Sequence, residues 1–424
     1  MAPQPHRLTE LDNGLRVVTE RLEGVRSIAL GVWVDSGSRS EPEERAGISH
    51  FIEHLLFKGT DHYTAYDIAR IFDEMGGEPN AATSREHTLV HARFLDEHLT
   101  RAFEVLAEMV TRPSFDNIAA EREVVLEEVA MYEDSPPELI HDHLAEAVFG
   151  GHSLGRAIIG HADSLRAQDE AAVAAYHRQH YVNAAMVMAA CGNVDHDAIC
   201  ELAARCYPAE PQTSSRRPHN APPAARRVAV FTQKDTEQYH VCLGGRAVTR
   251  YDPRRYALWV ADTILGGSWS SRLFQEVRDE RGLAYSVYSY TSLYADSGLM
   301  AVYFGSREEA VEEAFRLILA EMRDLAAEVP AEEVARAKNH LKGQLVLSME
   351  SPHSRMQSLG RAILFGLPVL TMDEMLAHID AVTADDVCAV AAEYLDPATW
   401  TAACIGPSAG PFRNVTEDFE WVER

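Results

Sequence analysis

The chain has 424 residues, and its 39 Lys and Arg against 65 Asp and Glu give a formal net charge of −26 at pH 7. This length predicts at least two domains, and a composition of 46% hydrophobic and 25% charged residues excludes a collagen-like or mostly disordered chain. The negative charge disfavours nucleic acid and anionic lipid surfaces as partners.

No apolar run approaches the roughly 20 residues that a membrane helix needs, so we expect no membrane contact. The first residues show neither a secretory signal nor a transit-peptide pattern, which favours a soluble, cytoplasmic protein. The six cysteines lack C-x-x-C spacing, so we expect buried reduced thiols, with one disulfide left open as an alternative.

The first half begins with a predicted strand at 27–34, which leads into a helix at 47–57. A Gly-Gly turn and a polar strand of small residues follow over 76–91, before an acidic amphipathic helix at 119–132. A short strand at 185–191 ends this half.

The acidic helix carries both carboxylates and apolar side chains. We assign to its apolar face the residues Val124, Val125, Val129 and Met131.

A proline-rich segment at 208–223 interrupts these patterns and predicts a linker between domains at 1–207 and 224–424. The second half repeats the order of the first, which indicates a weak internal repeat. Its predicted elements are strands at 239–246 and 399–405 and helices at 254–265, 308–328 and 331–349.

Strands and helices do not alternate strictly, which is typical of α+β domains. We therefore predict two homologous domains, each a mostly antiparallel sheet packed with long helices. We further predict that the two domains face each other as a clam shell, with a cleft between them as the place for a site.

His50, Glu53 and His54 stand at positions i, i+3 and i+4 of the predicted helix at 47–57, so their side chains share one face. Two imidazoles at this spacing can bind one Zn²⁺, and a carboxylate one residue before the second His can accept a proton from water. A catalytic zinc also needs a third protein ligand, which must come from elsewhere in the chain.

The acidic helix offers the best donors. Glu121 and Glu128 are seven residues apart and lie on one stripe, whereas Glu127 points away. One of the pair could bind the metal while the other bonds a ligand histidine. A solvated acidic face is the alternative when this helix is considered alone.

His50-x-x-Glu53-His54 is the H-x-x-E-H pattern of the inverzincins. With Phe57-Lys-Gly-Thr60 and the segment from Glu121 to Glu128, it resembles the pitrilysin-type zinc metallopeptidases, most closely the branch of mitochondrial processing peptidase β subunits. The resemblance covers nearly the whole chain. It implies one Zn²⁺ per chain with His50, His54 and Glu128 as ligands, Glu53 as the general base and Glu121 as a partner behind a ligand.

Two further segments match the family. Asn80, Ala81 and Ala82 resemble its edge strand, whose backbone pairs with an extended substrate. Arg278 and Tyr285, seven residues apart in the second half, resemble the pair that holds the substrate carbonyl and stabilises the oxyanion. This arrangement implies that the two halves close together on the substrate.

The sequence therefore predicts a zinc-dependent endopeptidase that cleaves extended peptides or unfolded segments in an enclosed cleft. A dedicated precursor-processing protease and a non-catalytic scaffold subunit of the same fold are the alternatives. The expected partners are a peptide substrate, with basic or amphipathic peptides favoured by the acidic chain, and a second copy or a related chain, as homodimer or heterodimer. The resemblance alone implies the dimer.

Overall fold

The structure is a computed structural model that describes residues 6–210 and 220–423. The chain forms two compact units, and neither unit is one continuous stretch of sequence. Unit 1 takes its residues from Met1–Val129, Ala157–His219 and Val346–Thr371. Unit 2 takes its residues from Ala130–Arg156, Asn220–Leu345 and Met372–Arg424.

Unit 1 is built on a six-stranded sheet in the order β1-β2-β6-β3-β5-β4. Its strands are β1 (His6–Glu10), β2 (Arg16–Arg21), β3 (Ser27–Val34), β4 (Glu78–Thr83), β5 (Thr88–Leu95) and β6 (Met186–Gly192). Among the described strands of this sheet, β2 and β6 pair in parallel, and the other neighbours are antiparallel. β4 stands last in this order, so its outer edge has no partner among the described strands.

Helices cover both faces of this sheet, which is why nearly all of β3 is buried. On one face, α3 packs on β5 and β3 and α8 packs on β2, while α1 contacts β4 and β5. The helices from the first half are α1 (Ile48–Leu55), α2 (Ala65–Glu74), α3 (Leu99–Thr111), α4 (Ile118–Glu133), α6 (Ala162–Arg166), α7 (Glu170–His180) and α8 (His196–Cys206).

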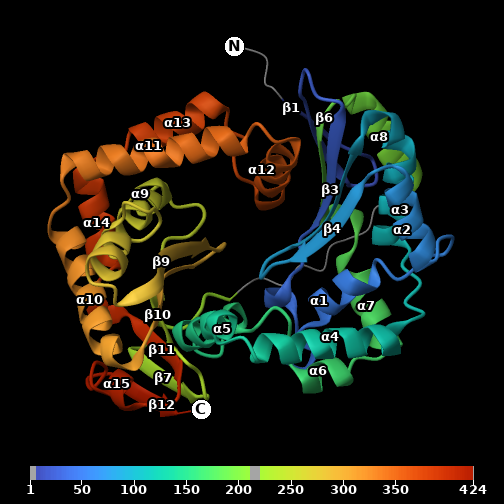
Figure 1. Cartoon of the computed structure of the whole chain (residues 1–424). Helices are drawn as coiled ribbons and strands as arrows, with labels where there is room; N and C mark the ends of the chain where they lie inside the picture. Colours follow the sequence, from blue (N-terminus) through green and yellow to red (C-terminus); the bar gives the residue numbers. More distant parts are fainter. Residues whose placement is uncertain (1–5, 211–219, 424) are drawn as a thin grey trace. The chain divides into compact units, whose positions relative to one another are not determined.

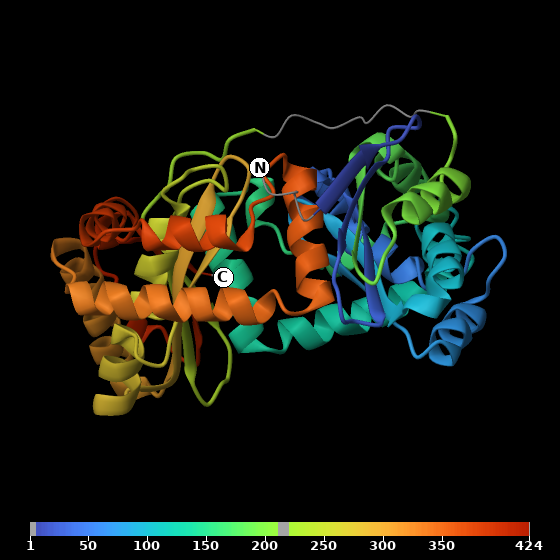
Figure 2. The ribbon, with the colours of Figure 1, turned by 90° about the horizontal axis from the view of Figure 1, so that it is seen from above.

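The opposite face of the first sheet is covered by α12 (Pro352–Phe365), which comes from the second half of the chain. Figure 1 shows this orange helix beside the blue strands, and Figure 2 shows it upright against them. The contact is close because Gly360 lies against the Trp33 ring, where a Cβ atom would overlap the indole. Arg355 of the helix also pairs with Glu20 of β2.

Unit 2 has a second six-stranded sheet, in the order β12-β7-β11-β8-β10-β9. Its strands are β7 (Val228–Gln233), β8 (Tyr239–Arg246), β9 (Ala284–Leu293), β10 (Gly298–Ser306), β11 (Thr401–Gly406) and β12 (Glu420–Glu423). Its helices from the second half are α9 (Arg255–Leu265), α10 (Val311–Ala327), α11 (Ala331–Ser348), α13 (Met372–Asp380), α14 (Ala384–Tyr394) and α15 (Gly410–Arg413), with a π-helical segment at Phe274–Glu280.

One face of the second sheet is covered by α5 (Pro136–Phe149), which comes from the first half. Ile140, Leu144 and Val148 of this helix form a buried cluster with strand residues such as Val230 and Tyr303. Figure 1 shows the green-blue helix against the yellow and red strands. The two halves of the chain thus exchange one helix each.

The two sheets share one connection order, because β2-β6-β3-β5-β4 corresponds strand by strand to β7-β11-β8-β10-β9. The exchanged helices are also alike: α5 follows Ser135 and is followed by Gly150, and α12 follows Ser351 and is followed by Gly366. Both glycines have positive φ. This likeness supports the internal repeat. Most of the predicted linker, residues 211–219, lies outside the described residues.

The α+β class is confirmed, and both sheets are mixed, with β7 running parallel to β11 and β12. The prediction that Val124 and Met131 lie on an apolar face is wrong, since both side chains are exposed while Val125 and Val129 are buried. Three strands were not predicted. They are β1, β2 and β7, which precede the strands predicted to open each half.

None of the described helices combines the length and the apolar character that crossing a membrane requires. All six cysteines are free thiols, and three of them, Cys191, Cys242 and Cys404, are buried. The expected burial therefore holds for these three cysteines, whereas Cys200, Cys206 and Cys388 are half-buried.

Candidate metal centre

The candidate site begins with α1, a short helix whose N-terminus is fixed by Glu41. The two carboxylate oxygens of Glu41 accept hydrogen bonds from the backbone N–H groups of Gly47 and Ser49, each at 2.8 Å. Gly47 has φ of 87°, a conformation that favours glycine. Phe51, Ile52 and other apolar residues of the helix are fully buried, so its other side is free to present polar groups.

His50 and His54 lie one turn apart on that side, with ring centroids 4.7 Å apart. Glu128 of α4 reaches both rings: its Oε2 lies 3.2 Å from His54 Nε2, and its Oε1 lies 3.7 Å from His50 Nε2. One ligand atom from each of the three residues lies within 4.8 Å of the others. Burial, together with the neighbouring His54, lowers the pKa of His50 to about 4, so His50 is neutral at pH 7 and offers a lone pair.

The donor atoms fit a divalent cation. His54 Nδ1 lies 2.9 Å from a carboxylate oxygen of Glu121, so the tautomer with its proton on Nδ1 can donate a hydrogen bond to Glu121. In that tautomer the lone pair of Nε2 faces the carboxylate of Glu128, an arrangement that a bound cation would stabilise. Two imidazole nitrogens and one carboxylate oxygen are a ligand set that Zn²⁺ takes in hydrolytic sites.

Glu53 lies beside these candidate ligands on α1, and a residue of the sheet fixes its side chain. The hydroxyl of Thr83, the last residue of β4, donates a hydrogen bond of 2.5 Å to Glu53 Oε2. Burial raises the pKa of Glu53, and the hydrogen bond from Thr83 acts in the opposite direction. A carboxylate with a raised pKa is suited to taking up a proton and releasing it again.

Glu121 of α4 lies behind His54. Its side chain is only 5% exposed. Its Oε2 forms an ion pair of 2.9 Å with Lys58 Nζ, and its Oε1 faces His54 Nδ1. The structure thus gives the two glutamates different contacts: Glu128 faces Nε2 of both histidines, and Glu121 faces Nδ1 of His54. Glu127 is exposed.

Two polar contacts of this site were not predicted: Thr83 with Glu53, and Lys58 with Glu121. Thr83 belongs to a strand 30 residues from Glu53, and Lys58 lies just beyond the end of α1. Lys58 stands four residues after His54, a spacing that could have indicated that both side chains meet one partner.

The predicted substrate strand is β4, at the free edge of the first sheet. Its other edge pairs with β5, with Asn80 opposite His91 and Ala82 opposite Leu89. The side-chain carbonyl of Asn80 accepts a hydrogen bond of 2.8 Å from the backbone N–H of Ala81. This edge strand ends at Thr83, the residue whose hydroxyl donates a hydrogen bond to Glu53.

Arg278 and Tyr285 belong to unit 2 and contact each other there. The guanidinium of Arg278, in the π-helical segment, lies over the Tyr285 ring at 4.8 Å from its centroid. Tyr285 is on β9, the free edge of the second sheet, and is 78% exposed. Their predicted role toward a substrate carbonyl stays a prediction.

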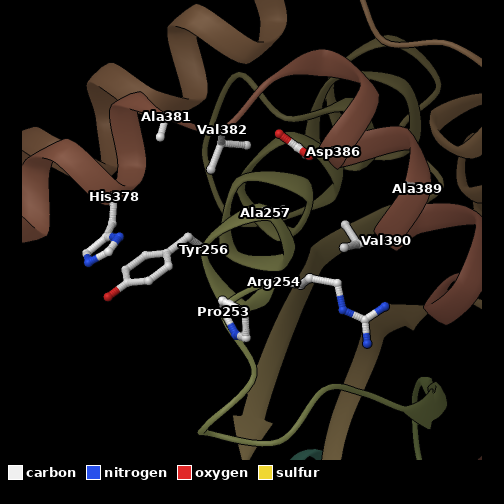
Figure 3. Close-up of a pocket in the computed structure, with 10 residues that line it drawn as sticks. All are labelled: Pro253, Arg254, Tyr256, Ala257, His378, Ala381, Val382, Asp386, Ala389 and Val390. Carbon is white, nitrogen blue, oxygen red and sulfur yellow. The ribbon is translucent and has the colours of Figure 1, made fainter. Parts of the chain in front are cut away.

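A separate hollow of about 290 Å³ lies in unit 2 among α9, α13 and α14 (Figure 3). On one side the rings of Tyr256 and His378 stack at 4.7 Å. Its charged groups are already bonded, Arg254 to Glu393 and Asp386 to the start of α14.

The comparisons with known proteins agree with this geometry. Residues 16–162 match the model of the insulinase family, peptidase family M16, and residues 169–341 match that of the peptidase M16 inactive domain. An uncharacterized zinc protease of Streptomyces coelicolor is 41% identical over 92% of this chain and 87% of its own. One of Mycobacterium tuberculosis is 41% identical over 95% of this chain and 93% of its own.

A probable mitochondrial-processing peptidase subunit beta of Arabidopsis thaliana is 34% identical over 95% of this chain and 78% of its own length. Among solved structures, a protease from Helicobacter pylori has the same fold, with a TM-score of 0.89 at 23% identity over 95% of this chain and 99% of that one. The fold and the His, His and Glu group define the class of zinc metallopeptidases with an inverted H-x-x-E-H motif. The chain belongs to peptidase family M16.

Proposed function

We propose that this chain is a zinc-dependent endopeptidase that hydrolyses peptide bonds in extended peptides or unfolded segments. One observation carries the proposal: His50, His54 and Glu128 bring their ligand atoms within 4.8 Å of one another, with Glu53 fixed beside them. The zinc protease relatives at 41% identity support it.

When bound by His50, His54 and Glu128, Zn²⁺ supplies the Lewis acidity that activates water and polarises a carbonyl. Glu53 takes a proton from the attacking water and later delivers it to the leaving amine. Thr83 occupies Oε2 of Glu53 and so leaves the other oxygen for this proton. An extended peptide that pairs with the free edge of β4 would lie next to this carboxylate.

We include Arg278 and Tyr285 in the proposal as donors to the substrate carbonyl, a role that requires both units to contact one peptide. Both side chains can donate hydrogen bonds to a developing negative charge, and Tyr285 is exposed for such a contact. Tyr285→Phe should lower kcat by roughly 10²-fold and leave bound zinc unchanged. Tyr251→Phe, at another exposed tyrosine of unit 2, is the matched control.

The proposal is tested by measuring zinc content and peptide hydrolysis in two variants. Glu53→Gln should retain zinc and lose turnover, whereas His50→Ala should lose the metal. His161→Ala, at an exposed histidine of the same unit, should change neither property. A Glu53→Gln variant with normal turnover would refute the assignment.

The finer predictions are part of the same proposal. Cleavage-site profiling on a peptide library separates a general endopeptidase, which cuts many sequences, from a dedicated processing protease, which cuts one type. The charge of −26 favours basic or amphipathic peptides, and cleavage of acidic peptides at equal rates would contradict that preference. A mass measurement in solution decides between a single chain and the predicted homodimer or pair with a related chain.

A further inference from the structure

We propose that Lys58 is a positioning residue of the metal centre, which acts through Glu121 on the ligand His54. The inference rests on the proposed function and adds a residue whose effect is on metal binding. It is carried by two contacts that meet on one carboxylate.

The first contact joins Lys58 to Glu121. Lys58 Nζ lies 2.9 Å from Glu121 Oε2. Lys58 follows directly on α1, where its backbone N–H donates to Leu55 O at 3.0 Å, so the start of its side chain has a fixed position. Its side chain is 38% exposed, and its ammonium group reaches a carboxylate that is only 5% exposed.

The second contact joins Glu121 to His54. The remaining oxygen, Oε1, lies 2.9 Å from His54 Nδ1. Both oxygens of Glu121 are therefore occupied by side chains four residues apart on the same segment of chain. This double contact defines the rotamer of Glu121 and the plane in which it accepts the hydrogen bond from the ring.

The burial of Glu121 explains why its carboxylate needs the positive charge of Lys58 beside it. A carboxylate removed from water is costly unless it is paired and hydrogen-bonded. Glu121 lies on the same stripe of α4 as Glu128, and Glu53 is close by on α1, so the centre gathers negative charge. Lys58 offsets one of these charges through its ion pair with Glu121.

The consequence for metal binding follows from the geometry of the ligand ring. A carboxylate on the far nitrogen fixes the ring's tautomer and orientation and makes the other nitrogen a better ligand; loss of such a partner typically weakens metal affinity 10- to 100-fold. Without Lys58, Glu121 loses the contact that holds it toward His54. Zinc affinity should then fall although every ligand is still present.

The test measures the zinc dissociation constant of full-length protein by competition with a chromogenic chelator. We expect Lys58→Met to weaken zinc binding about tenfold and Lys58→Arg to restore it, because arginine can also pair with the carboxylate. Lys342→Met removes a comparable lysine–carboxylate pair in unit 2, with Asp380 at 2.7 Å, and should leave the constant unchanged.

A double-mutant cycle shows whether Lys58 acts through Glu121. In a Glu121→Gln background, the further change Lys58→Met should have little effect, because the charge that Lys58 pairs with is already gone. An equal loss in both backgrounds would overturn the inference. The visible absorption spectrum of the Co²⁺-loaded protein should shift in Lys58→Met and return in Lys58→Arg, whereas a general loss of stability would not move it.

Lys58→Gln serves if the methionine variant does not fold, since it keeps an N–H donor but no charge. Its zinc affinity should fall between those of the wild type and Glu121→Gln, and an affinity equal to that of the wild type would overturn the inference. These readouts do not require turnover. A wild type that binds zinc but cleaves no peptide would refute the proposed function alone, and a wild type that binds no zinc would refute both.

Discussion

Thr83 donates a hydrogen bond to Glu53, from the end of a sheet-edge strand to a helix that lies 30 residues earlier in the chain. The contact is 2.5 Å long and ties the candidate base to the strand on which we expect the substrate to bind. The orientation of Glu53 therefore depends on β4 as well as on α1.

Replacing Thr83 by valine removes this donor and keeps the side-chain shape. We expect kcat to fall about tenfold or more, since a hydrogen bond to a charged group contributes roughly 1.5–3 kcal/mol, while zinc content stays unchanged. Steady-state kinetics on a peptide substrate measure the effect. Thr83→Ser retains the hydroxyl and should restore most of the rate; equal kcat values for the valine and serine variants would contradict the role of the hydrogen bond.

Glu41 should stabilise α1, the helix of the candidate metal site, at its N-terminus. Glu41→Ala removes the acceptor of the Gly47 and Ser49 N–H groups, so the free energy of unfolding should fall by about 2 kcal/mol. Chemical denaturation measures this loss. Glu44→Ala is the matched control, because Glu44 is exposed nearby and should change stability little. Equal stabilities of the two variants would show that the cap is unimportant.

The contact between α12 and the first sheet requires glycine at position 360. Gly360→Ala places a methyl group against the Trp33 ring, and overpacking of this kind typically costs roughly 1–3 kcal/mol. Gly343→Ala in α11 is the control, because no atom lies near its added methyl group. This second variant should be unchanged or more stable by up to about 1 kcal/mol. Thermal unfolding of both variants decides, and a stabilised Gly360→Ala would contradict the packing.

His177 should make stability fall at acidic pH. Burial lowers the pKa of His177 to about 4 in the folded protein, against about 6.5 in an unfolded chain. As the pH falls below about 6.5, the unfolded chain gains a proton that the folded protein does not, so the folded state loses stability progressively toward pH 4. The stability contributed by the neutral ring is thus fully present only above the unfolded value.

His177→Gln removes this titration and can keep an N–H donor toward Val110 O, which His177 Nε2 contacts at 2.9 Å. The drop in unfolding free energy between pH 7.5 and pH 5 should therefore be smaller than in the wild type, by up to about 2 kcal/mol. Urea unfolding at the two pH values measures it. The same drop in both proteins would show that His177 does not carry the effect.

The helix of the candidate metal site, α1, was predictable because its signal is local. His50, Glu53 and His54 are fixed relative to one another by helix geometry alone, and Glu121 and Glu128 lie on one stripe of another helix for the same reason. The two helices were brought together in the sequence analysis only through the need for a third ligand and through the family resemblance. Their contact is tertiary, and no periodicity encodes it.

Other features were not predictable for the same physical reason. The hydrogen bond from Thr83 depends on where a strand ends next to a helix, and the exchange of α5 and α12 depends on packing between distant segments. The apolar residues of α4 were assigned partly to the wrong side, because Val124 and Met131 are exposed in a helix whose apolar residues are spread around its axis. In this helix the spacing of the carboxylates predicted which side faces the histidines, and the pattern of apolar residues did not.

The exchange of helices has a consequence for the order in which the protein can fold during synthesis. All six strands of the first sheet are made by residue 192, yet the helix that covers Trp33 and its neighbours is not complete until residue 365. Until then, one apolar face of that sheet has no cover from its own unit. A ribosome must therefore translate most of the second half before unit 1 can close its core, so early termination should release an aggregation-prone chain rather than a folded half.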